Sequence, residues 1–214
     1  LETVPPLLRP GVQALLFQVL RQLGWAQAIR RQLAPRTPRP PVDALLCAAL
    51  ALLADTENPP YEAFTLVNQT IEAAKNNSAV RAQAAFINAC LRRFLREREA
   101  LQQAVAYDLQ AQWNHPRWWV QRLQKEHLKD EKRWQQILQA NNTQAPMVLR
   151  INKRKSTVAQ YLRALEAIDI RAFQVGEAGL VLERAVPVHV LPGFADGVVS
   201  VQDAAAQLAA PILM

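Results

Sequence analysis

The chain has 214 residues, half of them apolar, which is enough for one large domain or two small ones with buried cores. Its formal net charge of +7 indicates either a polyanionic partner or simply a basic surface. The longest apolar run, residues 44–54, is too short to span a bilayer, and no signal peptide stands out, so we expect no membrane partner.

The first hundred residues predict a compact all-α bundle of about five helices. Apolar residues from Val12 to Leu23 follow the i, i+3, i+4, i+7 spacing of a one-sided helix, and the prolines at 35–41 must end it. Residues 44–54 are apolar on all sides, as expected of a central helix surrounded by others. The proline pair at 59–60 should open a further helix. Its apolar face would consist of Phe64, Val67, Ile71 and Ala74.

Residues 101–145 also have a helical pattern and predict a linker region. Asn114 is expected to cap a helix that has Pro116 in its first turn, with Trp118 and Trp119 on its apolar side. A second helix would carry Trp134 on its apolar side and end at residues 141–142.

The hydrophobic period changes after residue 145. Strand candidates and one helix follow each other as β-α-β-β plus an extra strand, which predicts a small α+β domain. Ser156 is expected to cap the helix, and Asp203 should begin another helix near a C-terminus that looks truncated, as does the N-terminus. The expected strands cover residues 147–151, 170–175, 180–182 and 198–201.

Cysteine and histidine positions give no sign of a metal centre. Cys47 and Cys90 lie in apolar helical contexts without a CxxC pair, which predicts buried thiols in a reducing, cytoplasmic setting. His115, His127 and His189 are scattered and lack metal-ligand spacing. No glycine-rich nucleotide loop and no supported Ser/His/Asp set is visible, so we expect no complete active site.

The strongest local feature is a basic helix that ends in residues 91–98. On such a helix Arg81, Asn88, Arg92 and Arg96 fall close to one line, opposite the apolar face. Guanidinium groups spaced one turn apart can contact successive phosphates of a nucleic acid. The competing interpretation is a solvated basic face, which also gains from cations near a helix C-terminus.

A second basic segment, residues 150–155, follows the first expected strand. Alternation on that strand puts Arg150 and Asn152 on one face and Ile151 on the other. The four cations of the segment suit a nucleic-acid backbone, and a polar loop after a strand is an equally good interpretation.

Four tryptophans form a third feature, next to Arg117 and Arg122. Aromatic rings beside arginines can stack on unpaired bases. Tryptophans at helical spacing more often pack in a core or between domains, and packing is the preferred interpretation here. The four are Trp113, Trp118, Trp119 and Trp134.

Several segments together resemble the bacterial ribosomal RNA cytosine-5 methyltransferase family called Sun or RsmB. Their order and spacing follow the family through the second half of the chain, and the first hundred residues resemble its NusB-like helical domain more loosely. One departure is Ala206, where relatives often carry a serine or another small residue. The matching segments are NHPRWW at 114–119, ANN at 140–142, PMVLRIN at 146–152, PVHVLPGF at 187–194 and VQDAAAQ at 201–207.

The resemblance implies a multi-domain, mainly α protein with a division of labour. A NusB-like all-α bundle at 1–100, a helical linker at 101–145 and a small α+β domain at 146–200, related to the RNA-recognition-motif fold, would bind and orient small-subunit ribosomal RNA. Residues 201–214 would begin a Rossmann-like domain that binds S-adenosylmethionine and uses a cysteine to attack the pyrimidine ring. The family's cofactor loop and functional cysteines lie downstream. The resemblance therefore assigns no catalytic, cofactor-binding or metal-binding residue to this chain.

The resemblance also favours RNA contact at both basic segments, although Arg150 alternatively braces the catalytic domain. The expected RNA-binding residues are Arg81, Asn88, Arg92, Arg93, Arg96, Arg98, Arg117, Arg150, Asn152, Lys153, Arg154 and Lys155.

Two other functions stay open beside an RNA-binding region of a methyltransferase. One is a stand-alone NusB-like transcription antitermination factor, against which residues 114–207 argue because such factors end after the helical bundle. The other is a helical adaptor that docks on an acidic protein. The sequence alone sets neither the modified nucleotide, nor ribosomal against transfer RNA, nor the oligomeric state.

Overall fold

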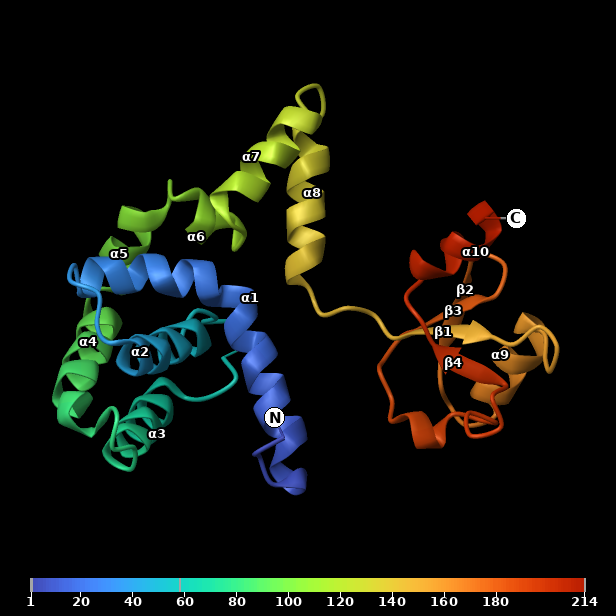
Figure 1. Ribbon diagram of the computed structural model, residues 1–214, viewed down its shortest axis with the longest axis horizontal. Coiled ribbons are helices and arrows are strands. Elements are labelled where there is room, and N and C mark those ends of the chain that lie inside the picture. Colours follow the sequence, from blue (N-terminus) through green and yellow to red (C-terminus); the bar gives the residue numbers. More distant parts are fainter. Residues whose placement is uncertain (1, 58, 214) are drawn as a thin grey trace. The chain divides into compact units, whose positions relative to one another are not determined.

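The chain folds into two compact units, Leu1–Thr143 and Gln144–Met214. The computed structural model describes residues 2–57 and 59–213. The first unit is helical and the second contains a small sheet (Figure 1). A mainly α chain with a small α+β domain is therefore confirmed. Within the described residues, no helix combines the length and the apolar character needed to cross a membrane.

Helices make up the first unit, and α2 lies at its centre because it is apolar almost all round. Leu46 and Leu50 of α2 are fully buried against Ile29 of α1 and Ile87 and Phe94 of α4, which confirms the expected central helix. Burying a side chain of this size contributes about 1.5–3 kcal/mol. The helices are α1 (Arg9–Leu33), α2 (Pro40–Leu52), α3 (Ala63–Lys75), α4 (Ala84–Arg96), α5 (Arg98–Val105), α6 (Leu109–Trp113), α7 (Arg117–Glu126) and α8 (Glu131–Asn142), with short 3₁₀ turns η1 (Pro6–Leu8) and η2 (Arg81–Gln83).

Helices α6, α7 and α8 share a small core of their own. Trp113 and Trp134 meet edge to face with 4.9 Å between ring centroids, and Val120 and Leu138 are fully buried beside them. This core holds α7 and α8 together as an antiparallel hairpin (Figure 1).

The apolar face predicted for α3 is partly wrong. The helix begins at Ala63 rather than at the proline pair, and Phe64 in its first turn is 75% exposed. Val67 and Ala74 are buried as predicted, and Leu66 and Thr70 are buried with them. Thr70 can be buried because its hydroxyl donates a 2.7 Å hydrogen bond to the Leu66 carbonyl and needs no water.

The apolar face predicted for α1 is wider than the surface that the helix meets. Leu15, Val19 and Leu23 pack against the core, whereas Leu16 and Leu20 are each nearly half exposed. The predicted apolar face of period 3.6 is present, but the described residues cover only one side of it.

Asn114 joins α1 to α8 and does not cap α7 as predicted. Its backbone lies in the left-handed region at φ 55° and ends α6, while Pro116 precedes the first residue of α7. Its side-chain amide donates to the Leu20 carbonyl at 2.8 Å and to Asn142 Oδ1 at 3.2 Å, and its Oδ1 accepts from the Gly24 amide at 2.6 Å. The polar side chain is thus used across the fold rather than at a helix N-terminus.

The Asn114 side chain makes these hydrogen bonds in the middle of α1, and the helix bends part-way along its length (Figure 1). Leu20 and Gly24 are partners in the i→i+4 hydrogen-bond ladder, and a side chain that enters this ladder is a known cause of helix bends. Glycine is needed there, because a Cβ on Gly24 would lie 2.4 Å from the Gln110 carbonyl oxygen.

The second unit is a four-stranded antiparallel sheet in the order β2-β3-β1-β4. Leu149, Tyr161, Leu165, Leu180 and Leu182 form its buried core between the sheet and α9. The order β-α-β-β plus a fourth strand agrees with the predicted pattern. The elements are β1 (Val148–Ile151), α9 (Val158–Glu166), β2 (Ala172–Val175), β3 (Gly179–Leu182), η3 (Val188–Val190), β4 (Val199–Val201), η4 (Ala206–Leu208) and α10 (Ala209–Leu213).

Thr157, and not Ser156 as predicted, caps α9. The Thr157 hydroxyl accepts from the Gln160 amide at 3.2 Å, and Gln160 Oε1 accepts from the Thr157 amide at 3.1 Å. This capping box requires Glu or Gln three residues after the cap, and only the later of the two hydroxyl residues has one.

Replacing Gly24 by alanine should lower the free energy of unfolding by about 1–3 kcal/mol, since the new Cβ overpacks the contact with α6. Urea unfolding followed by circular dichroism measures the change. Gly11→Ala is the matched control in the same helix, because a Cβ there meets nothing within 4 Å. The control should raise stability by about 0.5–1 kcal/mol. Effects of the same sign and size would contradict the close approach at Gly24.

Candidate nucleic-acid interface

Part of the predicted arginine row lies on α4. Asn88, Arg92 and Arg96 follow each other at intervals of one turn, and the opposite side of the helix is buried. Arg92 Nε donates to Asn88 Oδ1 at 3.2 Å, which confirms that these side chains are neighbours. The row can therefore present cations along one exposed edge of the bundle.

Arg81 is not part of this row, contrary to the sequence analysis. It lies on η2, and α4 begins only at Ala84, so the helical periodicity does not extend back to it. Its Nε donates to the Lys75 carbonyl at 2.7 Å and satisfies an open acceptor at the end of α3.

Glu97 neutralises two arginines of α4, Arg93 and Arg96. Its two carboxylate oxygens accept from Arg93 Nε and Arg96 Nη2, each at 2.8 Å. These hydrogen bonds, first from Arg93 and then from Arg96, lower the pKa of Glu97. Arg92 takes part in no ion pair within the described residues and is the most available cation of the row.

Arg98 faces the bundle rather than solvent. Its Nη2 donates to the Leu53 carbonyl at 2.8 Å, its guanidinium lies 4.9 Å from the centroid of the Phe94 ring, and burial lowers its pKa. It ties the start of α5 to the end of α2, so its contacts are structural.

The basic segment of the second unit forms an ordered turn. Asn152 Nδ2 donates to the Gly197 carbonyl at 3.0 Å, and its Oδ1 accepts from the Arg154 amide at 3.1 Å. Lys153 pairs with Glu177 at 2.7 Å, which lowers the pKa of that carboxyl, and Lys155 Nζ donates to the Asp196 carbonyl.

Arg150 and Arg154 remain the exposed guanidinium groups of this segment. Arg150 is exposed on β1 and donates weakly, at 3.3 Å, to Gln202 Oε1, while Ile151 is buried on the other face as predicted. The Arg154 side chain has no ion pair among the described residues. The polar-loop interpretation thus fits Asn152, Lys153 and Lys155. The phosphate-contact interpretation fits Arg150 and Arg154.

The tryptophans divide into two kinds. Trp113 and Trp134 pack in a core, as preferred from the sequence, and Trp119 is half-buried. Trp118 is 67% exposed, so it is not part of the core formed by the described residues. Arg117 beside it is exposed too.

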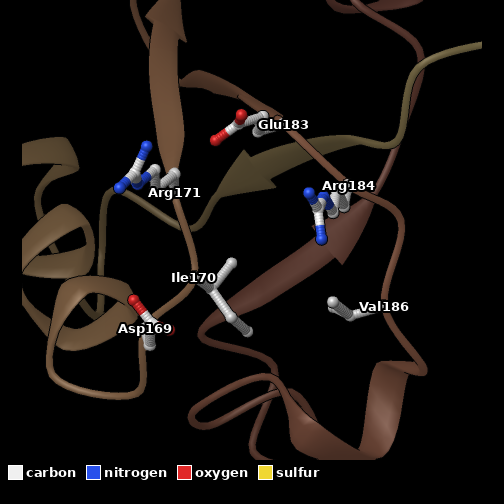
Figure 2. A pocket seen from close by; sticks show the side chains of 6 residues that line it. All are labelled: Asp169, Ile170, Arg171, Glu183, Arg184 and Val186. Atoms are coloured by element: carbon white, nitrogen blue, oxygen red, sulfur yellow. The ribbon is translucent and has the colours of Figure 1, made fainter.

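A further cavity, with charged residues of both signs in its lining, was missed by the sequence analysis. A cavity of about 340 Å³ in the second unit is lined by Asp169, Ile170, Arg171, Glu183, Arg184 and Val186. Figure 2 shows that the two arginines come from different segments, one before β2 and one after β3. They are 13 residues apart, so only the β2–β3 hairpin register brings them to one place.

Both cysteines are buried, as predicted. Burial raises the pKa of Cys47 to about 11 and also raises the pKa of Cys90. A thiol in this state is a poor nucleophile at neutral pH. Within the described residues, no group of three His, Cys, Asp or Glu side chains could hold a metal ion.

Comparisons with known proteins give the family. Residues 115–189 match the model of the RsmF/B-like methyltransferase ferredoxin-like domain. The chain is 37% identical over 94% of its length to ribosomal RNA small subunit methyltransferase B of Vibrio cholerae, and 36% identical over 92% to that of Escherichia coli O157:H7. Over the part that it covers, the chain belongs to the ribosomal RNA small subunit methyltransferase B family. It spans about half the length of these curated relatives, 47% and 45% respectively.

A solved structure supports the fold of this family member. The crystal structure of PH0851 matches 99% of the chain and 48% of its own length with a TM-score of 0.64 at 14% identity. At that identity the likeness concerns the fold alone. The matched ferredoxin-like region includes α7, α8 and most of the second unit, and thus two of the segments that carried the RsmB resemblance.

Arg98→Ala should lower the free energy of unfolding by about 1–3 kcal/mol, because it leaves the Leu53 carbonyl without its donor. Arg92→Ala is the matched control on the adjoining helix and should change stability by less than about 0.5 kcal/mol. Thermal and urea unfolding of both variants measure the difference. If Arg98→Ala left the free energy of unfolding unchanged, the structural role of this arginine would be contradicted.

Both thiols should react with Ellman's reagent only as the bundle unfolds. The pKa of Cys47 is about 11 against an ordinary 9.0, so the folded state holds the protonated thiol. Since the folded pKa of Cys47 is raised, protonation of this thiol favours the folded state. Its contribution to the free energy of unfolding is complete below pH 9 and is lost as the pH rises towards 11. Fast labelling at pH 7.5 without denaturant would contradict the burial of the thiols.

Proposed function

We propose that this chain is the RNA-binding N-terminal region of an S-adenosylmethionine-dependent methyltransferase that forms 5-methylcytosine in small-subunit ribosomal RNA. The observation that carries the proposal is its 37% identity, over 94% of its residues, to a protein named for methylation of that RNA. Ribosomal RNA would place the activity in the bacterial cytoplasm. The chain's own contribution would be to bind and orient the RNA.

Two features support the finer assignment of the units. The helices α1–α5 form a compact bundle with a basic edge on α4, which suits the NusB-like RNA-binding domain proposed for residues 1–100. The sheet with α9 suits the RNA-recognition-motif-like domain proposed for 146–200. Within these units the exposed guanidiniums of Arg92, Arg117 and Arg154 are the best placed phosphate ligands.

The cavity beside β2 and β3 offers little to the methyl donor. Only Ile170 and Val186 of its lining give apolar surface for an adenine, and the other four lining residues are two arginines and two acids. We therefore propose that cofactor binding and catalysis belong to the half of the family's length that this chain does not span, with residues 201–214 as the start of that domain.

The 214-residue chain should bind transcripts of small-subunit ribosomal RNA with a marked salt dependence, because bound cations release counterions from the phosphates. Arg92→Ala should weaken binding about fivefold, the effect of ~1 kcal/mol, and reduce the slope of log K against log salt by about 1. Filter binding between low and moderate salt measures both. Arg163→Ala, on an exposed site of α9, is the matched control and should change neither.

Two outcomes would contradict the proposal. One is failure of the intact chain to bind the transcript at low salt. The other is tight binding of S-adenosylmethionine by these 214 residues in calorimetry, which would overturn the division between RNA binding and catalysis.

A further inference from the structure

Trp118 is an exposed tryptophan that the fold does not explain. It lies at the start of α7, and 67% of it is open to solvent, while Trp113 and Trp134 nearby are buried. Trp119 is its aromatic neighbour, with ring centroids 5.6 Å apart and an interplanar angle of 71°. The indole thus has one ring contact, and most of its surface is open to solvent.

The surroundings of Trp118 are polar and not apolar. Its neighbour Arg117 is exposed, and so are Gln121 and Arg122, which lie three and four positions along the same helix and therefore flank the ring. A docking site for another protein has a wider apolar core. An isolated aromatic ring among hydrogen-bonding and cationic side chains is instead typical of surfaces that hold single-stranded nucleic acid.

The segment that carries the ring, residues 114–143, is positively charged, and most of its cations are unpaired. Residues 114–143 contain six cations and three acids. The acids are engaged: Glu126 pairs with Arg122, Asp130 caps α8, and Glu131 accepts from Gln135. Five of the six cations form no ion pair within the described residues. They are Arg117, Lys125, Lys129, Lys132 and Arg133.

We propose that Trp118 is a stacking platform for an unpaired base of the RNA, with Arg117 holding a neighbouring phosphate. The inference rests on the proposed function, because it takes RNA as the ligand. It further predicts that this site prefers single-stranded or looped segments of the RNA. Stacking on an indole favours a base that has left its helix, since bases inside a helix are covered on both faces by their stacked neighbours. Sequence preference at this site is weak, because every base has such a face.

The test compares binding of a labelled single-stranded oligonucleotide and of a blunt RNA duplex by fluorescence anisotropy, using the 214-residue chain. Trp118→Leu keeps an apolar contact with Trp119 but removes the aromatic surface, and should weaken single-strand binding about five- to 150-fold. Trp118→Phe should retain most of the affinity. Neither variant should change duplex binding. Tyr107→Ala is the control, because Tyr107 is 97% exposed in the same unit but adjoins Asp108 instead of an arginine.

Single-strand affinity that is unchanged in Trp118→Leu, or equally reduced in Trp118→Phe, would overturn the stacking role, and so would an equal loss for Tyr107→Ala. Circular dichroism of each variant checks that the fold is kept. Failure of the unaltered chain to bind any RNA would instead overturn the proposed function, so the two failures are distinguishable.

Discussion

The amide of Asn114 is the contact on which the arrangement of the first unit depends. It satisfies the Leu20 carbonyl and the Gly24 amide in the middle of α1, and it reaches Asn142 at the end of α8. Asn142 in turn donates to the Trp113 carbonyl at 2.8 Å. A partly buried polar cluster of this kind stabilises the fold only while each group has its partner. Its two asparagines lie in segments that carried the family resemblance, and their role in this chain is structural.

The basic character of the chain is less available than its net charge suggests. Glu97 and Glu177 neutralise cations of the two predicted segments, and Arg98 is turned into the bundle. What remains of these two segments is the exposed guanidiniums of Arg92, Arg150 and Arg154, and Trp118 beside Arg117 lies on another element. Affinity for RNA would then come from a few phosphate contacts combined with base stacking, rather than from one continuous positive surface.

Periodicity predicted the elements well where burial alone decides them. The central position of α2, the strands around β3 and the buried cysteines follow from local apolar patterns. Predictions that depend on a distant partner were wrong. Asn114 has the composition of a helix cap, but its ligands lie about 90 residues away, and nothing local indicates them. The side-chain contacts of Arg81 and Arg98 are likewise made with carbonyls outside their own helices, which the periodicity does not indicate, and their RNA-binding role stays a prediction.

The link between Asn114 and the middle of α1 has a consequence for folding during synthesis. The two ends of this contact are separated by 90 residues, so the ribosome must release most of the first unit before α1 can adopt its final bent form. Until then, the Leu20 carbonyl and the Gly24 amide have only water or each other as partners. Emergence of Asn114 from the exit tunnel, and not completion of α1 itself, thus sets the earliest moment at which the helical unit becomes native.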